Sequence, residues 1–195
     1  MIHVSQNQFS VGSTIPHQLV PFAAKGVPHK AKAAVSAYVE GEGWKNGESL
    51  VFVGPPSSGK TTALLAVHKM LHDHRGARLT SNFWTERDYL DDMNNLDRLE
   101  RMTTSLKDDG LWAEYMAWER DFWAFKKSPI LFLDNVGHGR TAFQTSEMEY
   151  LYRLREELGL ATISSIQSIP WANLDESFRA VVSRHALVVL LTEEY

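Results

Sequence analysis

Cysteine is absent from all 195 residues of the chain. This absence excludes disulfide bonds and metal sites built on thiolate ligands. The sequence also lacks a run of about 20 apolar residues, the length that a membrane-spanning helix needs. Its first residues show no basic stretch followed by an apolar block, which a secretory signal would require. We therefore expect a protein of the bacterial cytoplasm, encoded by the bacterium or by a phage, with no membrane partner.

A surplus of basic residues is missing as well, because 20 Lys and Arg stand against 24 Asp and Glu. Free-standing DNA-binding domains usually carry a strongly basic balance. Any contact with nucleic acid is therefore expected from a local patch or from several subunits together. The length and the hydrophobic fraction of 44% predict one globular domain with a full-sized core.

The clearest motif that is present runs from Leu50 to Thr62. An apolar stretch typical of a strand leads into a loop of the form G-x-x-x-x-G-K-T, and a helical pattern follows. The two glycines allow the backbone to direct successive N–H groups at an anion, next to the positive end of a helix. We expect Lys60 to contact the β- and γ-phosphates of a nucleoside triphosphate, and Thr61 to bind Mg²⁺. The residues expected to bind this cofactor are Gly54, Pro55, Pro56, Ser57, Ser58, Gly59, Lys60, Thr61 and Thr62.

A second motif, the apolar run Ile130–Asp134, follows about 75 residues after Lys60. Asp134 is expected at the carboxyl end of a buried strand, where it would hold Mg²⁺ through water opposite Thr61. The next residue is Asn135. At this position many nucleoside triphosphatases with such a loop have a carboxylate that orients or deprotonates the attacking water. An amide orients water but accepts no proton. Asn135 therefore predicts slow hydrolysis unless a base comes from elsewhere.

Periodicity and capping signals predict an alternation of strands and helices. Helices are expected over residues 31–38, 60–74, 85–93, most of 94–128, 146–158 and 171–178, and strands over 50–53, 78–83, 130–134, 160–166 and 186–191. The capping boxes are expected at Thr85 with Asp88 and at Ser146 with Glu149. This alternation predicts a parallel sheet that is covered on both faces.

The set of motifs resembles the helicase-loader group of AAA+ ATPases, of the DnaC and DnaI type, and the related transposition ATPases of the IstB type. The resemblance is carried by the helix 31–40, the loop Gly54–Thr61, the run Leu131–Gly137, the strand 161–165 and the box Val182–Arg184. It implies a P-loop NTPase three-layer α/β sandwich of the AAA+ (ASCE) type, with a parallel five-stranded sheet in the order 5-1-4-3-2 and no C-terminal lid domain. Residues 31–195 would form this ATPase core, and residues 1–30, with several Gly and Pro, an extended N-terminal arm.

The resemblance also implies the cofactors ATP and Mg²⁺ and self-association into a ring or spiral. An arginine of one subunit would then contact the γ-phosphate held by the next. Arg184 is the candidate for this finger, with Arg179 as the fallback. The sensor 1 position falls on Ser165, Ile166 or Gln167.

The implied partners are a hexameric replicative helicase and single-stranded DNA, in a compact, phage-like version of a loader. Two alternatives stay open. One is an IstB-like ATPase that regulates transposition on double-stranded DNA, and the other is a nucleotide-switched interaction module with little hydrolysis.

Aromatic residues cluster between residues 112 and 125 on an expected helix. Trp112, Tyr115 and Phe122 share one face at helical spacing. This face is expected either to pack on the core or to form an exposed platform for a partner protein or for the bases of single-stranded DNA. Trp118 lies off that face and is the aromatic residue for which we expect exposure.

Overall fold

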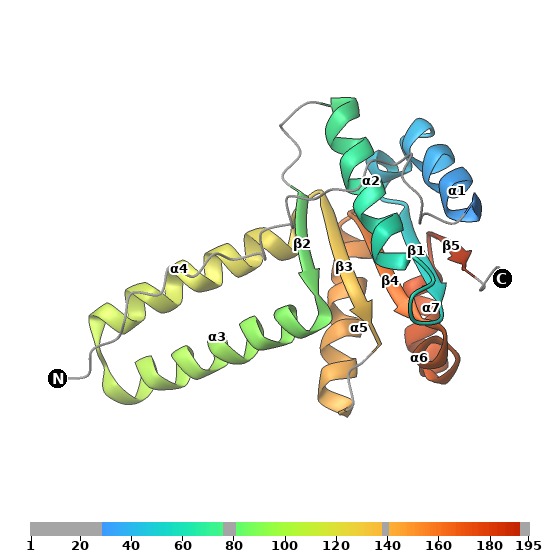
Figure 1. Cartoon of the computed structure of the whole chain (residues 1–195). Helices are drawn as coiled ribbons and strands as arrows, with labels where there is room; N and C mark the ends of the chain where they lie inside the picture. The colour runs from blue at the N-terminus through green and yellow to red at the C-terminus, as the bar shows by residue number, and fades with distance from the viewer. Residues whose placement is uncertain (1–28, 76–80, 138–140, 192–195) are drawn as a thin grey trace.

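The structure is a computed structural model of the chain, which describes residues 29–75, 81–137 and 141–191. Five strands form one sheet in the order β2-β3-β4-β1-β5, and every neighbouring pair is parallel (Figure 1). The strands are β1 (Ser49–Gly54), β2 (Ser81–Thr85), β3 (Ile130–Val136), β4 (Ala161–Gln167) and β5 (Ala186–Leu190). Read from the other edge, this is the order 5-1-4-3-2, so the predicted parallel five-stranded sheet and its strand order are confirmed.

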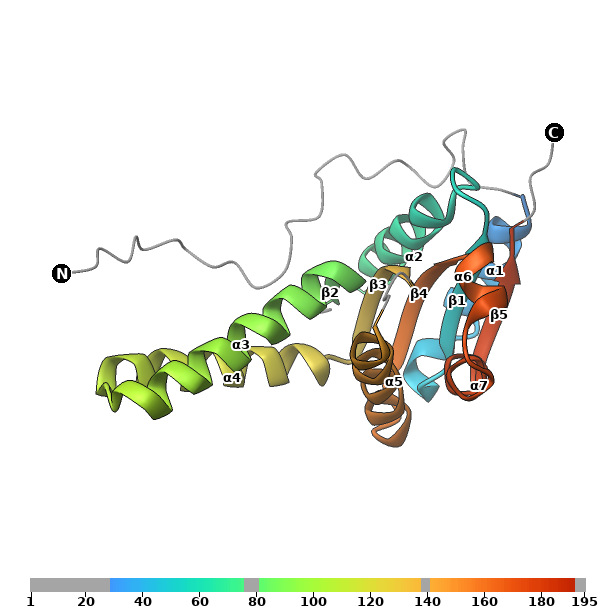
Figure 2. The same cartoon turned by 90° about the horizontal axis from the view of Figure 1, so that it is seen from below.

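Helices cover both faces of the sheet, because successive strand residues point to opposite sides. Leu50 and Phe52 of β1 pack with α1 (His29–Glu40) and α2 (Lys60–Arg75) in one apolar core. Val51 and Val53 pack in a second core with α5 (Ala142–Glu157) and α7 (Glu176–Ser183), on the opposite face (Figure 2). The short helices η1 (Gly43–Asn46) and α6 (Ser168–Asn173) connect α1 to β1 and β4 to α7. The result is a three-layer sandwich.

The helix expected over 85–93 continues to Leu106, and the helices expected over 146–158 and 171–178 also differ from those observed. The helix α5 begins at Ala142, not at Ser146, because Thr141 and Gln144 form the capping box. The Thr141 hydroxyl accepts from the Gln144 N–H at 3.2 Å, and the Gln144 side chain accepts from the Thr141 N–H at 3.2 Å. The single helix expected over 171–178 is divided into α6 and α7, since Asp175 caps a new helix. Residues 78–80 of the expected second strand, and the arm over 1–28, lie outside the described residues.

A helical hairpin extends from the β2 edge of the sheet (Figures 1 and 2). It consists of α3 (Glu86–Leu106) and α4 (Asp109–Lys126), which lie between β2 and β3 in the sequence. The two helices pack against each other. Thr85 caps α3 through the predicted box with Asp88, and Asp108 caps α4. Of residues 91–121, all of which the structure describes, only Thr103 is buried. No helix in the described part of the chain is both long and apolar enough to cross a membrane.

Arg155 of α5 joins the hairpin to the sheet from inside the core. Its guanidinium is fully buried and donates to the carbonyls of Lys126 at 2.6 Å, Ser128 at 3.0 Å and Ala161 at 2.5 Å, and to the Thr162 hydroxyl at 2.9 Å. Burial lowers the pKa of Arg155 to about 10. Neutral oxygens thus hold a buried cation at the place where α4 ends and β3 and β4 begin. Sequence periodicity did not reveal this role.

Candidate functional site

The loop between β1 and α2 has the tight backbone that its glycines predicted. Gly59 has a φ of 83° and Ser57 a φ of 61°, both in the left-handed region. Gly54 needs the absence of a side chain, since a Cβ there would lie 2.5 Å from the carbonyl oxygen of Leu191 and 2.6 Å from Ser58 Oγ. Within the motif, Gly54 and Lys60 are buried, Pro56, Ser57 and Thr61 are exposed, and Pro55, Ser58, Gly59 and Thr62 are half-buried.

The ammonium group of Lys60 lies inside this loop, and the residue is only 6% exposed. Its Nζ donates to the carbonyls of Gly54 at 3.0 Å and Pro55 at 2.5 Å, and to Ser58 Oγ at 3.4 Å. Burial lowers the pKa of Lys60, while the Asp134 carboxylate acts in the opposite direction. Phosphate oxygens form stronger, charge-assisted hydrogen bonds than these neutral acceptors do. The loop therefore presents a confined cation that suits a bound polyphosphate.

Asp134 connects the loop with the neighbouring strands at the carboxyl edge of the sheet. Its Oδ2 accepts from Thr61 Oγ1 at 2.8 Å, and its Oδ1 accepts from Ser165 Oγ at the end of β4. The carboxylate is 5% exposed, so both oxygens are held in place. A hydroxyl beside a carboxylate is the type of pair that binds Mg²⁺ together with phosphates and water. No cluster of three or more His, Cys, Asp or Glu among the described residues provides an alternative metal cage.

The structure distinguishes among the three residues considered for sensor 1. Ser165 contacts Asp134 and also accepts from the backbone N–H of Asn135 at 3.0 Å. Ile166 is buried in the apolar core, and Gln167 is the last residue of β4. Of the three, the structure thus brings Ser165 to the Asp134 carboxylate.

Asn135 leaves the strand immediately after Asp134. Its φ is 58°, its side chain is exposed, and the register between β3 and β4 shifts between Leu133 and Val136. Asn is among the residues that tolerate this left-handed conformation. Asn135 thus follows Asp134 directly at the carboxyl edge of the sheet, at the sequence position where we expected a water-orienting group.

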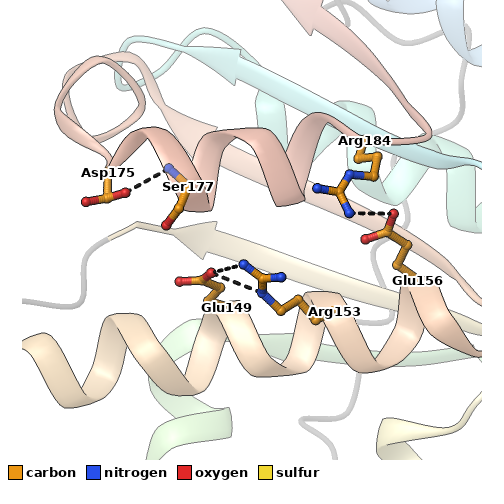
Figure 3. Close-up of polar contacts among 6 residues, drawn as sticks. All are labelled: Glu149, Arg153, Glu156, Asp175, Ser177 and Arg184. Carbon is orange, nitrogen blue, oxygen red and sulfur yellow. Dashed lines mark hydrogen bonds and ion pairs between the residues drawn. The ribbon is translucent and has the colours of Figure 1, made fainter.

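Arg184 lies at the opposite end of the sheet from Lys60. It ends α7, is about half exposed, and its Nη1 lies 3.5 Å from Oε1 of Glu156 (Figure 3). The next residue, His185, accepts through its carbonyl from the N–H of Ser49, the first residue of β1. A strand of this length spans about 20 Å, so Arg184 lies far from the Lys60 loop of its own chain. The contact with Glu156 had no signal in the sequence.

Arg184 also lines a pocket of about 320 Å³, together with Ser49, Glu156 and Thr162. The fallback residue, Arg179, lies on α7 and is half-buried. Its Nε is buried without a hydrogen-bond partner among the described residues. Of the two arginines, Arg184 is the more exposed.

The aromatic cluster of α4 changes its environment along the helix. Trp112 is 53% exposed, whereas Phe122 and Phe125 are buried in the core near β2. Trp118 is half-buried, so the expectation that it would be the exposed aromatic residue is wrong. The predicted face is therefore core at one end of α4 and surface at the other.

Comparisons with solved structures identify the fold. The chain is similar to the DnaC helicase loader, with a TM-score of 0.60 and 19% identity over 86% of this chain and 92% of that one. It is similar to DnaI, with a TM-score of 0.60 and 13% identity over 92% and 93% of the two chains. It is also similar to domain III of the Thermotoga maritima replication initiation protein DnaA, with a TM-score of 0.63 and 16% identity over 92% and 69%. Neither the comparison with protein-family models nor that with curated proteins finds a match. The chain therefore has the AAA+ P-loop fold of the DnaC and DnaI helicase loaders and of this DnaA domain.

Proposed function

We propose that the chain is an AAA+ ATPase of DNA replication that loads a hexameric replicative helicase onto single-stranded DNA. The observation that carries the ATPase part is the 2.8 Å contact between Thr61 and Asp134, next to the buried Lys60. The loader part is supported by the likeness in fold to DnaC and DnaI over most of each chain. Two solved DnaA structures of this fold contain the ATP analogue AMPPCP, and the second of them also contains single-stranded DNA.

In this proposal the residues of the loop 54–62 surround the triphosphate of ATP. Lys60 exchanges the carbonyls of Gly54 and Pro55 for phosphate oxygens, which are the better partners for an ammonium group. Thr61 and Asp134 would hold Mg²⁺, which would neutralise charge on the phosphates. Ser165 keeps the second oxygen of Asp134 in place through the hydrogen bond that it donates.

A neighbouring subunit completes the site. The exposure of Arg184 and its position at the far end of β1 support a role in trans, since the side chain is remote from its own Lys60. In a ring or spiral, Arg184 of one subunit would contact the γ-phosphate held by the next. Such an arginine stabilises charge that develops in the transition state and contributes about 10³–10⁵-fold in rate.

A nucleotide-switched interaction module with little hydrolysis is the second candidate. Asn135 favours it, because the residue after Asp134 is an amide, which accepts no proton, where the sequence led us to expect a carboxylate. The chain would then bind ATP, assemble and hold its partner, and release it only slowly. The two candidates differ in turnover and share the same site.

The decisive experiment is a helicase-loading assay on circular single-stranded DNA, with the purified chain, ATP, Mg²⁺ and the replicative helicase of the bacterium that carries the gene. The chain should deliver the helicase, and Lys60→Ala should abolish delivery. Lys69→Ala is the matched control, since Lys69 pairs with Asp73 on the surface of the same helix. Failure of the unaltered chain to bind the helicase, with binding of a transposase instead, would contradict the loader proposal.

A further inference from the structure

The closed end of the α3–α4 hairpin exposes four large apolar side chains. These residues, which we call the hairpin tip, are Met102 (39% exposed), Leu106 (63%), Trp112 (53%) and Met116 (45%). On each helix the two residues are four positions apart, and therefore share one face. The turn at Lys107 and Asp108 places both pairs at the same end of the hairpin.

In the described part of the chain, the hairpin tip lies outside both apolar cores. Phe122 and Phe125 at the other end of α4 belong to the core, whereas the tip residues are absent from both core clusters. The rings of Trp112 and Tyr115 lie 5.5 Å apart, so the tryptophan is supported on one side by its neighbour. Tryptophan and methionine are enriched at the centres of protein interfaces, where they contribute much of the binding energy. An exposed tryptophan with a supporting ring, at the same end of the hairpin as two exposed methionines, is thus suited to a protein contact.

The charge of the hairpin indicates the chemistry of its partner. Residues 86–127 contain eleven Asp and Glu but only seven Lys and Arg, a balance of −4 that equals the net charge of the whole chain. Three of the arginines are already near acids of the same hairpin, in the pairs Arg87–Asp91, Arg101–Asp97 and Arg120–Asp121. The acids Asp108, Asp109 and Glu114 lie next to the tip in sequence and are exposed. This balance repels DNA phosphates and a second copy of the hairpin, and it favours a partner with Lys and Arg around an apolar centre.

We propose that the hairpin tip docks the replicative helicase, on a helicase surface that is apolar at its centre and basic at its rim. This inference rests on the proposed function, because it names the part of the chain that holds the proposed partner. The helix α3 has 21 residues, so the tip projects about 30 Å along the hairpin. Docking there leaves the Lys60 loop and Arg184 free for contacts between subunits.

The test measures the affinity of the full chain for the purified replicative helicase of the same bacterium. Trp112→Ala combined with Met116→Ala removes the apolar centre, and we expect the dissociation constant to rise at least tenfold. Phe143→Ala is the matched control, since Phe143 is 58% exposed on α5; its affinity should equal that of the unaltered chain. Glu114→Lys should weaken binding more at low salt than at high salt, whereas Glu157→Lys, the same charge change on α5, should have no effect.

The outcomes separate this inference from the function on which it rests. If the unaltered chain does not bind the helicase, both the proposed function and the docking inference are wrong. If the unaltered chain and the tip variant bind the helicase equally well, only the docking inference is overturned. Light scattering and single-stranded DNA binding on the same variants define the remaining outcomes. If the tip variant forms smaller assemblies while its helicase affinity is unchanged, the tip contacts a second copy of the chain. If the variant loses DNA binding while its helicase affinity is unchanged, the tip contacts DNA. Either result would overturn the inference.

Discussion

The hydroxyl of Thr61 lies 2.8 Å from the carboxylate of Asp134, although 73 residues separate them in the sequence. The contact joins the start of α2 to the end of β3, and Ser165 holds the other carboxylate oxygen from β4. Three segments of the chain therefore converge on one carboxylate.

Replacement of Thr61 should affect the metal more than the nucleotide. Thr61→Ala removes the hydroxyl beside Asp134, so Mg²⁺ should no longer strengthen ATP binding, and the affinity in the presence of Mg²⁺ should fall about tenfold. Thr61→Ser keeps the hydroxyl and should behave like the unaltered chain. Titration with a fluorescent ATP analogue, with and without Mg²⁺, measures both effects. An equal loss of affinity in the absence of Mg²⁺ would mean that Thr61 contacts the nucleotide directly.

A carboxylate at position 135 should raise turnover. Asn135→Asp supplies a group that can accept a proton, and it suits the left-handed backbone at this position. We expect turnover to increase by about 10²-fold, at the low end of what general base catalysis contributes. Steady-state ATP hydrolysis measures the change. An unchanged rate, with unchanged ATP affinity, would show that a base already comes from elsewhere.

Subunit mixing tests the role of Arg184. Arg184→Ala should abolish hydrolysis and spare ATP binding by the monomer, and Lys60→Ala should abolish both. A mixture of the two variants should regain part of the activity, because a variant with an intact Lys60 meets a neighbour with an intact Arg184. Arg153→Ala is a suitable control, since Arg153 only pairs with Glu149 on the surface of α5 (Figure 3). Normal turnover by Arg184→Ala alone would refute the assignment.

Asp92 of the hairpin should make stability depend on pH. Burial, followed by the nearby Asp88 carboxylate, raises the pKa of Asp92 from 3.8 to about 6. The folded chain therefore binds this proton more tightly than the unfolded chain, and the unfolding free energy falls as pH rises from about 4 to 6. Because Asp92 is half-buried, screening by water reduces the effect to roughly 1 kcal/mol. Urea unfolding at pH 4 and pH 8 should show Asp92→Asn more stable than the unaltered chain at pH 8 only.

Loss of Arg155 should destabilise the fold. Arg155→Ala leaves the carbonyls of Lys126, Ser128 and Ala161 without their buried donor, and it opens a cavity where three elements meet. We expect a loss of about 3–5 kcal/mol in the free energy of unfolding. Arg153→Ala, two residues earlier on the exposed side of α5, should change it by less than about 0.5 kcal/mol. A small effect of Arg155→Ala would mean that water replaces the guanidinium.

The order of the strands was predictable from the resemblance to the helicase-loader family, and the position of the loop was predictable from its motif. A G-x-x-x-x-G-K-T loop requires a strand before it and a helix after it, and a buried apolar run that ends in Asp places a carboxylate at the same edge. The start of α5 was not predictable, since Thr141 with Gln144 and Ser146 with Glu149 are both valid capping boxes. Only the packing of the helix decides between them.

The remaining differences have tertiary causes. The contact of Ser165 with Asp134 depends on the register of β3 against β4, which shifts next to Asn135. The exposure of Trp112 depends on how far α4 extends beyond the core. The contact between Arg184 and Glu156 joins α7 to α5 and follows no sequence spacing. Local sequence patterns carry no information on these contacts or on the exposure of Trp112.

The helix cap at Thr85 gives the hairpin a mechanical property. Thr85 is both the N-cap of α3 and the register partner of Asp134 on the neighbouring strand. A stiff helix about 30 Å long converts a rotation of about 6° at its base into a displacement of about 3 Å at its end. The base of the hairpin therefore lies beside Asp134, so a small rotation there would be enlarged at the hairpin tip. A rearrangement beside Asp134 that leaves the core intact would therefore still displace a protein bound at the hairpin tip.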